Sequence, residues 1–558
     1  MRSRGQRERE KSTTPPTCRT DLSDGRALRH ETSNRPLTQG PCTPSGTSPR
    51  APTGTGRLVA GAAPCGTDDP SRRTALTLGT TTAATPWLGR AAAHARPATA
   101  GHGTRTSLDE PGITGPRRRT DDGTLDAERL TRSYLERIEH IDPLVRTVIE
   151  VVPGTLREAR RLDAERNRRR PPRGMPVPLK DLVESADRMQ TTAGSLALQG
   201  LRPAADATLV ARLRAAGAVI LGKTDLSERA GGMSLVHHAG WSARGGQTRN
   251  PYKLDRSPSR VQLRYGGRRR GRPVCRRETG TETNGSIIDP ASANCVDGVK
   301  PTVGLVGRGG VIPGVPSQDS VGTIARTVRG AAIVLGTGRD RRPRSGHRGH
   351  SDEIAPREAQ ATVIDPADIP TAEQLEDLPR SMIVQAYEVK RGLLTYLTSA
   401  PGDHPRCLEE LIAFHRAHAD SELRYVRQDG LEAVHHLDFT EHEYQQARAT
   451  NHRLSRAEGV DAVLRRFRLD ALVMPTTGPP AKGDLIRGDG YGGASTPTAL
   501  AGHPAISVPA GFAFDLPVGL TFMGTAWSEP TLLRPRLRHE QASRVRRPPA
   551  HRSPDVGF

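Results

Sequence analysis

The sequence reads GMPVPLKD at residues 174–181 and GTETNGSIIDPAS at residues 280–292, and these two stretches decide the fold class. The first places Lys180, a candidate base, at the end of a short apolar run. The second places Ser286 after a turn of small residues, where backbone N–H groups can converge on an oxyanion. A base, a nucleophile and an oxyanion hole are together the parts of covalent acyl-transfer catalysis.

The hydrophobic pattern around these stretches alternates between helix and strand. It predicts strands at residues 145–152, 175–179, 218–223, 471–475, 505–509 and 518–522. It predicts helices at residues 125–143, 156–166, 207–216, 376–396 and, with interruptions, 408–468. Pro143 is expected to end the first helix, and Asp206 is expected to cap the third. Such alternation indicates a layered α/β architecture.

The composition divides the chain into one ordered domain and two flanking segments. Residues 1–118 are rich in Thr, Pro, Gly, Arg and Ser without an apolar period, which predicts disorder. A single domain is expected over residues 119–540, with anomalous stretches at 259–279 and 336–375. Residues 541–558 are expected to form a disordered tail.

The formal net charge of +21 raises the question of a nucleic-acid partner. Nearly all of this charge is Arg, gathered at residues 260–277, 339–348 and 534–552 with almost no aromatic residues to stack on bases. No nucleic-acid partner is therefore expected. The six cysteines and the histidine pairs lack the spacing of a zinc site, so no metal is expected either.

The location of the protein depends on one segment near the N-terminus. No apolar run reaches about 18 residues, so no membrane span is expected. Residues 71–79 read SRRTALTLG, which is similar to a twin-arginine export signal. The protein is expected to be cytoplasmic, or exported if the segment near Arg72 is a signal.

Further stretches make the chain similar to the amidase signature family, whose members hydrolyse amides with a Ser–Ser–Lys triad. These stretches are TTAGS at 191–195, GWSARGGQTRNPY at 240–252, GVKPTVG at 298–304, SQD at 317–319 and AGHPA at 501–505. They follow the family's order over residues 124–258, 280–335 and 376–534. The resemblance implies a three-layer α/β/α sandwich around a mixed β-sheet.

The resemblance also implies the roles of the site residues. Ser286 would form an acyl-enzyme and Lys180 would be the base. The backbone N–H groups of Thr283, Asn284 and Gly285 would form the oxyanion hole. A bridging serine in a cis peptide, which costs about 3–4 kcal/mol, would relay protons between base, nucleophile and leaving amine. The implied reaction converts a small or peptide amide into a carboxylate and an amine or ammonia, without a cofactor. The oligomeric state stays open.

The bridging serine is missing from the place where the family has it. It should lie near Val261 and Gln262 in a loop rich in Gly and Ser, but eight of residues 259–278 are Arg. Codons allowed from Arg260 onward, read one base later, can spell GSSSGTAVAVAAGLCAA, which is typical of the family's loop and following helix. A reading-frame slip therefore accounts for the segment. Unpaired arginines cannot replace an apolar helix in a core, because burying them costs more than a domain's marginal stability.

Three interpretations follow from this conflict. The protein is an active amidase whose intact gene lacks the slip, an inactive remnant whose genome carries it, or a basic binding protein on an amidase scaffold. The last predicts binding that weakens steeply with salt.

Four other polar residues lie in family-like text. Ser195 and Ser242 are expected to be structural or to line the pocket, and Lys300 is expected to pack or pair locally. Asp181 either orients Lys180 or caps the turn that follows.

Overall fold

The computed structural model describes residues 125–165, 174–234, 236, 238–259, 277–338, 362–483, 493–543 and 545–549. All of them belong to the compact unit that spans Pro70–Phe558. The disorder expected for residues 1–118 falls outside the described residues, and so does the expected place of the bridging serine near Val261 and Gln262.

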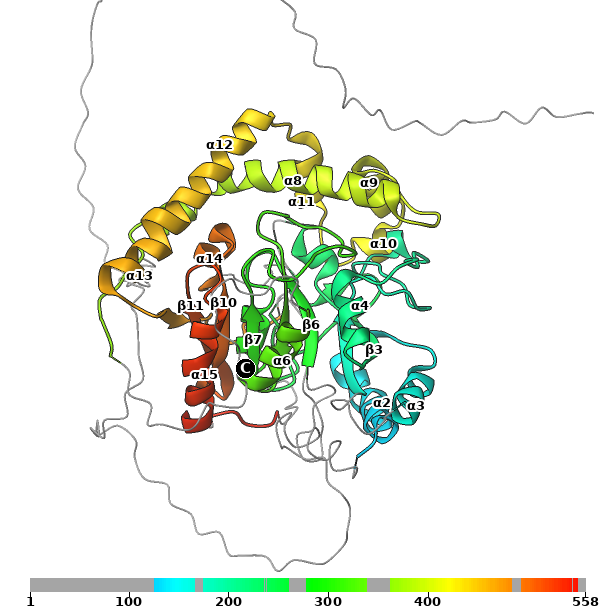
Figure 1. Cartoon of the computed structure of the whole chain (residues 1–558). Helices are drawn as coiled ribbons and strands as arrows, with labels where there is room; N and C mark the ends of the chain where they lie inside the picture. The colour runs from blue at the N-terminus through cyan, green and yellow to red at the C-terminus, as the bar shows by residue number, and fades with distance from the viewer. Residues whose placement is uncertain are drawn as a thin grey trace, which may run out of the picture. The chain divides into compact units, whose positions relative to one another are not determined.

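A mixed nine-stranded sheet forms the centre of the fold, in the order β1-β3-β2-β6-β8-β7-β10-β11-β9 (Figure 1). Its strands are β1 (Val148–Val151), β2 (Met175–Lys180), β3 (Ala218–Thr224), β6 (Arg277–Glu282), β7 (Asp297–Lys300), β8 (Ser320–Ala325), β9 (Leu472–Pro475), β10 (Ala505–Ala513) and β11 (Leu516–Met523). β2 runs parallel to both β3 and β6, whereas the other pairings are antiparallel. A separate short hairpin joins β4 (Trp241–Ser242) to β5 (Gly246–Gln247).

Helices cover both faces of the sheet. One face packs against α4 (Thr208–Ala215), α6 (Val328–Gly338) and α15 (Glu529–Ser543), and the other against α2 (Ala127–Val145), α3 (Thr155–Ala164) and α5 (Ile288–Ala293). Successive side chains of a strand point to opposite faces of the sheet, and β3 shows this. Ile220 lies in the core beside α4 and α6, whereas Leu221 lies in the core beside α2 and α5. The three-layer α/β/α arrangement expected from the sequence is confirmed.

A layer of helices lies beyond the ends of the strands, at the top of Figure 1. Its main members are α8 (Leu378–Ser399), α9 (Leu408–Ala417), α11 (Asp429–His436), α12 (Glu441–His452), η3 (Arg453–Val460) and α13 (Asp461–Phe467). The shorter elements are α7 (Ala372–Leu375), α10 (Ala419–Glu422), α14 (Ser495–Ala501), η1 (Leu196–Leu198) and η2 (Glu228–Gly231). Local sequence sets the starts of the longer helices: Thr440 and Glu443 form a reciprocal capping box at α12, and Asp377 caps α8.

Two expected helix boundaries are wrong. α2 continues past Pro143 to Val145, because Val145 is fully buried and the N–H of Arg146 still bonds to the carbonyl of Asp142. Asp206 does not cap α4. Its carboxylate accepts instead from the N–H of Ala186 at 2.7 Å and from Arg214 Nε at 3.0 Å, so no side chain caps α4.

Regular structure extends into two stretches that the sequence analysis set apart from the ordered domain, one at residues 277–279 and one after residue 540. Arg277–Thr279 form the first half of β6, paired throughout with β8, and Glu278 is fully buried. α15 runs to Ser543, past the domain boundary expected at residue 540. Beyond it, the carbonyl of Arg547 accepts a hydrogen bond from Tyr252 Oη at 2.5 Å. None of the described helices is long and apolar enough to cross a membrane.

The core between α4 and the sheet supplies a test of the fold. Leu209 is 2% exposed, so Leu209→Ala is expected to lower the free energy of unfolding by about 2–5 kcal/mol through the cavity that it leaves. Leu378→Ala makes the same change at a side chain that is 73% exposed, and should stay within about 0.5 kcal/mol. Urea unfolding followed by circular dichroism measures both, and equal losses would contradict the assigned core.

Candidate active site

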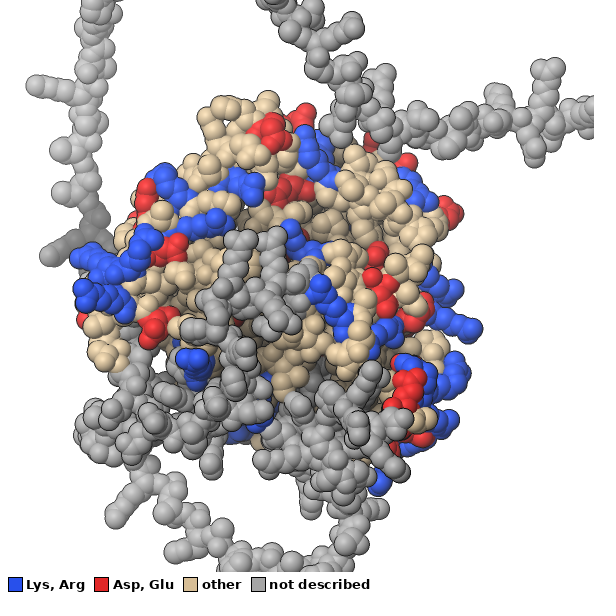
Figure 2. Space-filling model, in the orientation of Figure 1, with Lys and Arg blue, Asp and Glu red and all other residues tan. Residues whose placement is uncertain are grey.

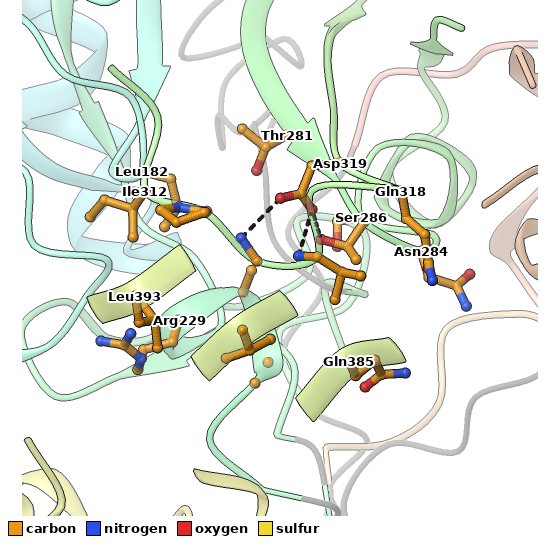
Figure 3. Close-up of a pocket in the computed structure, with 18 of the residues that line it drawn as sticks. Leu182, Arg229, Thr281, Asn284, Ser286, Ile312, Gln318, Asp319, Gln385 and Leu393 are labelled. Carbon is orange, nitrogen blue, oxygen red and sulfur yellow. Dashed lines mark hydrogen bonds between the residues drawn. The ribbon is translucent and has the colours of Figure 1, made fainter. Parts of the chain in front are cut away.

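A cavity of about 250 Å³ lies between the C-terminal ends of β2 and β6 and the helices α8 and α11. Its polar wall comes from the end of β6 and the turn before α5, and comprises Thr281, Thr283, Asn284 and Ser286. Its apolar wall includes Leu182, Ile312 and Leu393, which Figure 3 shows on one side of the pocket. The carboxyl ends of parallel neighbouring strands commonly form such sites, because the loops that follow them diverge and leave a crevice.

The turn that carries Ser286 has a defined geometry. Gly285 has φ +83°, a value that disfavours any other residue, and an added Cβ would lie 2.1 Å from Asp289 Oδ2. The N–H groups of Ile287 and Ile288 donate to Glu282 Oε2 at 2.7 and 3.1 Å. These contacts fix the backbone on both sides of Ser286, which is 3% exposed.

The same turn leaves donors available for an oxyanion. The N–H groups of Thr283 and Gly285 have no acceptor among the residues that the structure describes. Those of Ile287 and Ile288 are already satisfied by Glu282. An anion bound in this turn would therefore meet donors before Ser286 rather than after it.

Asp319 holds the turn through a hydrogen bond to Thr283, a role that the sequence analysis did not predict. It accepts from Thr283 Oγ1 at 2.5 Å and from the N–H groups of Gly314 and Val315 at 2.9 and 3.2 Å, and Figure 3 marks hydrogen bonds to it. Burial raises the pKa of the Asp319 carboxyl, and the bond from Thr283 opposes this shift. The SQD stretch at 317–319 was the available signal, because an acidic residue in otherwise apolar text needs donors when it is buried.

Lys180 lies at the end of β2, beside the strand that leads to Ser286. Its side chain is 1% exposed, and its Nζ donates to the carbonyl oxygen of Thr281 at 3.1 Å. Pairing of Leu179 with Thr279 sets this approach. The structure thus brings Lys180 and the Thr283–Ser286 turn to the ends of two adjacent strands.

Asp181 belongs to a different network from Lys180. Its carboxylate accepts from Thr192 Oγ1 at 2.5 Å and from the N–H of Gly194 at 3.3 Å. Lys223 Nζ lies 3.9 Å and Arg244 Nη1 3.6 Å from its oxygens. The sequence analysis expected Asp181 either to orient Lys180 or to cap the turn that follows. The carboxylate instead accepts hydrogen bonds from the turn at residues 192–194.

The remaining sequence candidates are structural. Ser195 Oγ donates to Glu422 Oε1 at 2.9 Å, and Ser242 Oγ donates to Asp225 Oδ1 at 2.7 Å. Lys300 Nζ donates to the carbonyls of Thr498 and His503 at 3.0 and 2.7 Å, so its partners are carbonyls that lie far from it along the chain. Burial lowers the pKa of Lys300 to about 8.

One group of described residues has the spacing of a metal site. Ligand atoms of Glu228, His415 and Glu422 lie within 4.8 Å of one another, and all three residues are buried. Their protein partners already account for much of this geometry: Glu422 Oε1 accepts from the N–H of Leu196 at 2.6 Å, and His415 Nδ1 lies 3.2 Å from Gln428 Oε1. Burial and the neighbouring Glu422 raise the pKa of Glu228 well above its ordinary value, and Glu228 Oε1 and Glu422 Oε2 make no hydrogen bond within the described residues.

The fold is a three-layer α/β/α sandwich with a cavity at the strand ends, and comparisons with known proteins give its family and activity class. The Amidase family model matches residues 129–259, 271–361 and 351–533. A protein of Arabidopsis thaliana named a probable amidase is 33% identical over 496 residues, which cover 79% of this chain and 92% of the relative. The chain belongs to the amidase family, and it is a hydrolase that acts on carbon–nitrogen bonds.

Solved structures agree with this assignment. The native peptide amidase from Stenotrophomonas maltophilia is 38% identical with a TM-score of 0.69, covering 79% of this chain and 98% of that chain. A peptide amidase in complex with the competitive inhibitor chymostatin is also 38% identical, with a TM-score of 0.69 and coverage of 79% and 99%. The family match breaks between residues 259 and 271, inside the arginine-rich segment, and again at residues 351–361, where its second and third pieces overlap.

The turn at Gly285 yields a paired prediction. Gly285 and Gly304 both have positive φ, but an added Cβ meets Asp289 at the first position and nothing within 4 Å at the second. Both alanine variants carry the backbone strain of about 1–3 kcal/mol, and Gly285→Ala should lose at least about 1 kcal/mol more than Gly304→Ala. Urea unfolding compares the two, and equal losses would show that the turn has room for a side chain.

Proposed function

We propose that this site hydrolyses linear carboxamides, including peptide amides, through an acyl-enzyme on Ser286 with Lys180 as the base. The observation that carries the proposal is the position of Lys180 Nζ, 3.1 Å from the carbonyl of Thr281, on the strand that leads into the Ser286 turn. Lys180 is buried, and burial disfavours the charged form of an amine, which suits Lys180 to the role of a base. The likeness to a peptide amidase that binds chymostatin supports a peptide-like substrate.

The proposed reaction proceeds in two halves. Lys180 accepts a proton from the bridging serine, which in turn accepts the proton of Ser286 Oγ as this oxygen attacks the amide carbon. The N–H groups of Thr283, Asn284 and Gly285 stabilise the oxyanion that forms. The relay then returns a proton to the departing nitrogen, and amine or ammonia leaves. In the second half water attacks the acyl group, Ser286 regains its proton, and the carboxylate leaves.

The relay determines whether the chain as it stands can complete this cycle. The arginine-rich segment takes the place of the bridging serine in the sequence, and we propose that it removes turnover without removing Ser286, Lys180 or the oxyanion turn. An intact gene would encode the active enzyme, whereas a genomic slip would leave an inactive remnant. Both interpretations share the same site, and they differ only in residues 260–276.

The mixed surface charge favours the enzyme over the basic binding protein. Figure 2 shows acidic residues interspersed with the basic ones on the visible face of the described residues. Interspersed charges give a weaker field than a stripe of one sign, and nucleic acid is drawn to the latter. We therefore propose an amide substrate as the partner, bound within one amidase domain over residues 119–540.

Restoring the segment tests the proposal directly. The full chain and a variant with GSSSGTAVAVAAGLCAA at residues 260–276 are assayed for ammonia release from a peptide carboxamide. The restored variant is expected to turn over, and the unrestored chain is not. In the restored background, Ser286→Ala and Lys180→Met should each lower kcat by at least about a thousandfold, because each removes one member of a unit that works together.

A serine away from the cavity gives the matched control. Ser399→Ala, on the exposed end of α8, should keep the kcat of the restored variant. A restored, folded variant without turnover would overturn the proposal. So would turnover that survives Ser286→Ala.

A further inference from the structure

Arg229 stands in the wall of the catalytic cavity in an unusual backbone conformation. Arg229, Ala230 and Gly231 have φ values of +50°, +58° and +88° in succession. The first two carry side chains, and such residues persist in this region at a cost of about 1–3 kcal/mol each only where the surrounding structure enforces it. The N–H of Arg229, bonded to the carbonyl of Ala193 at 2.8 Å, helps to hold the segment. The strained backbone at Arg229 and Ala230 places the Arg229 side chain in the cavity wall.

The guanidinium of Arg229 lacks partners among the described residues. Its Nη1 is buried and makes no hydrogen bond, and no carboxylate of the described chain lies within 4.0 Å of the group. Burial lowers the pKa of Arg229, although an arginine stays charged at any physiological pH. The Arg229 side chain as a whole is only half-buried, so the rest of the guanidinium stays accessible, and a half-buried cation with an unused donor is costly unless an anion completes its surroundings.

The nearest acidic groups compensate this charge only in part. Glu228 and Glu422 both act to raise the pKa of Arg229 from a distance. Burial and the neighbouring Glu422 raise the pKa of Glu228 well above its ordinary value, which weakens its compensation of the cation. Glu422 Oε1 accepts from Ser195 and from the N–H groups of Leu196 and Ala197, whereas its buried Oε2 makes no hydrogen bond within the described residues.

The rest of the cavity wall is also short of negative charge. Arg308 lines it as a second guanidinium, and its Nη1 donates to the carbonyl of Pro316. The carboxylate of Asp319 is occupied by Thr283 and two backbone donors. Figure 3 shows Arg229 and Ser286 on opposite sides of the pocket, with Leu393 next to Arg229. A ligand that spans the cavity from Ser286 meets apolar side chains first and a cation at its far end.

We propose that this cavity binds amides that carry a carboxylate at the end remote from the amide, and that Arg229 receives this carboxylate. The planar guanidinium can donate two parallel hydrogen bonds to a carboxylate, which discriminates strongly against a neutral end. The inference rests on the proposed function, because it takes Ser286 as the reacting end of the cavity. Arg229 selects the substrate and takes no part in the chemical step.

A binding experiment tests this inference without any need for turnover. The full chain carrying Ser286→Ala is titrated calorimetrically with adipamate, the monoamide of a six-carbon diacid, and with hexanamide, its neutral counterpart. Adipamate is expected to bind at least about tenfold more tightly, as for a charge-assisted pair. Arg229→Gln should remove this preference by weakening adipamate alone. Arg202→Gln, at an exposed arginine, should retain it.

The outcomes separate this inference from the proposed function. Equal binding of the two ligands, or binding of neither, overturns the role of Arg229. Equal weakening of both ligands in Arg229→Gln also overturns it, because that result describes a structural residue. Arg229→Lys keeps the charge in a variant of similar size, and it should preserve part of the preference. If the preference holds while the restored enzyme fails to hydrolyse amides, the proposed function fails and the anion site stands.

Discussion

The parallel pairing of β2 with β6 is the constraint on which the rest of the site depends. It places the last residue of one strand, Lys180, against the last residues of the other, and the bond from Lys180 Nζ to the carbonyl of Thr281 follows from this register. Parallel strands end at the same edge, so the turns that follow them must share one crevice. Lys180 and the turn that carries Ser286 are placed by that edge, while strands from both the parallel and the antiparallel pairings contribute to the core.

Buried polar groups around this edge are held by many short-range bonds. Asp319 fixes the turn before Ser286, Glu282 fixes the turn after it, and Asp181 fastens the neighbouring 192–194 turn. Each carboxylate pays for its burial with two or more donors, which makes the site rigid before any ligand arrives. Arg229 departs from this pattern, because a strained backbone presents it and the described residues leave its donors unused.

The sequence could predict the layers and the positions of Lys180 and Ser286, because short apolar runs and glycine-rich turns are local signals. It could not predict the partners of Asp181, Asp206 or Asp319. Their donors lie in other turns and helices, such as Thr192 for Asp181 and Arg214 for Asp206, and the fold rather than a local sequence pattern brings them to the carboxylates. The sequence also could not predict that Arg229 lines the cavity, because its position depends on left-handed φ values that no sequence pattern indicates.

The central claim is that Ser286, activated through Lys180, is the nucleophile of this amidase. Labelling with a fluorophosphonate, which phosphonylates an activated serine, tests it most directly in the variant with the restored segment. Tandem mass spectrometry should locate the adduct on Ser286, and Lys180→Met should abolish it. An adduct on another serine, or none in a folded restored variant, would contradict the account.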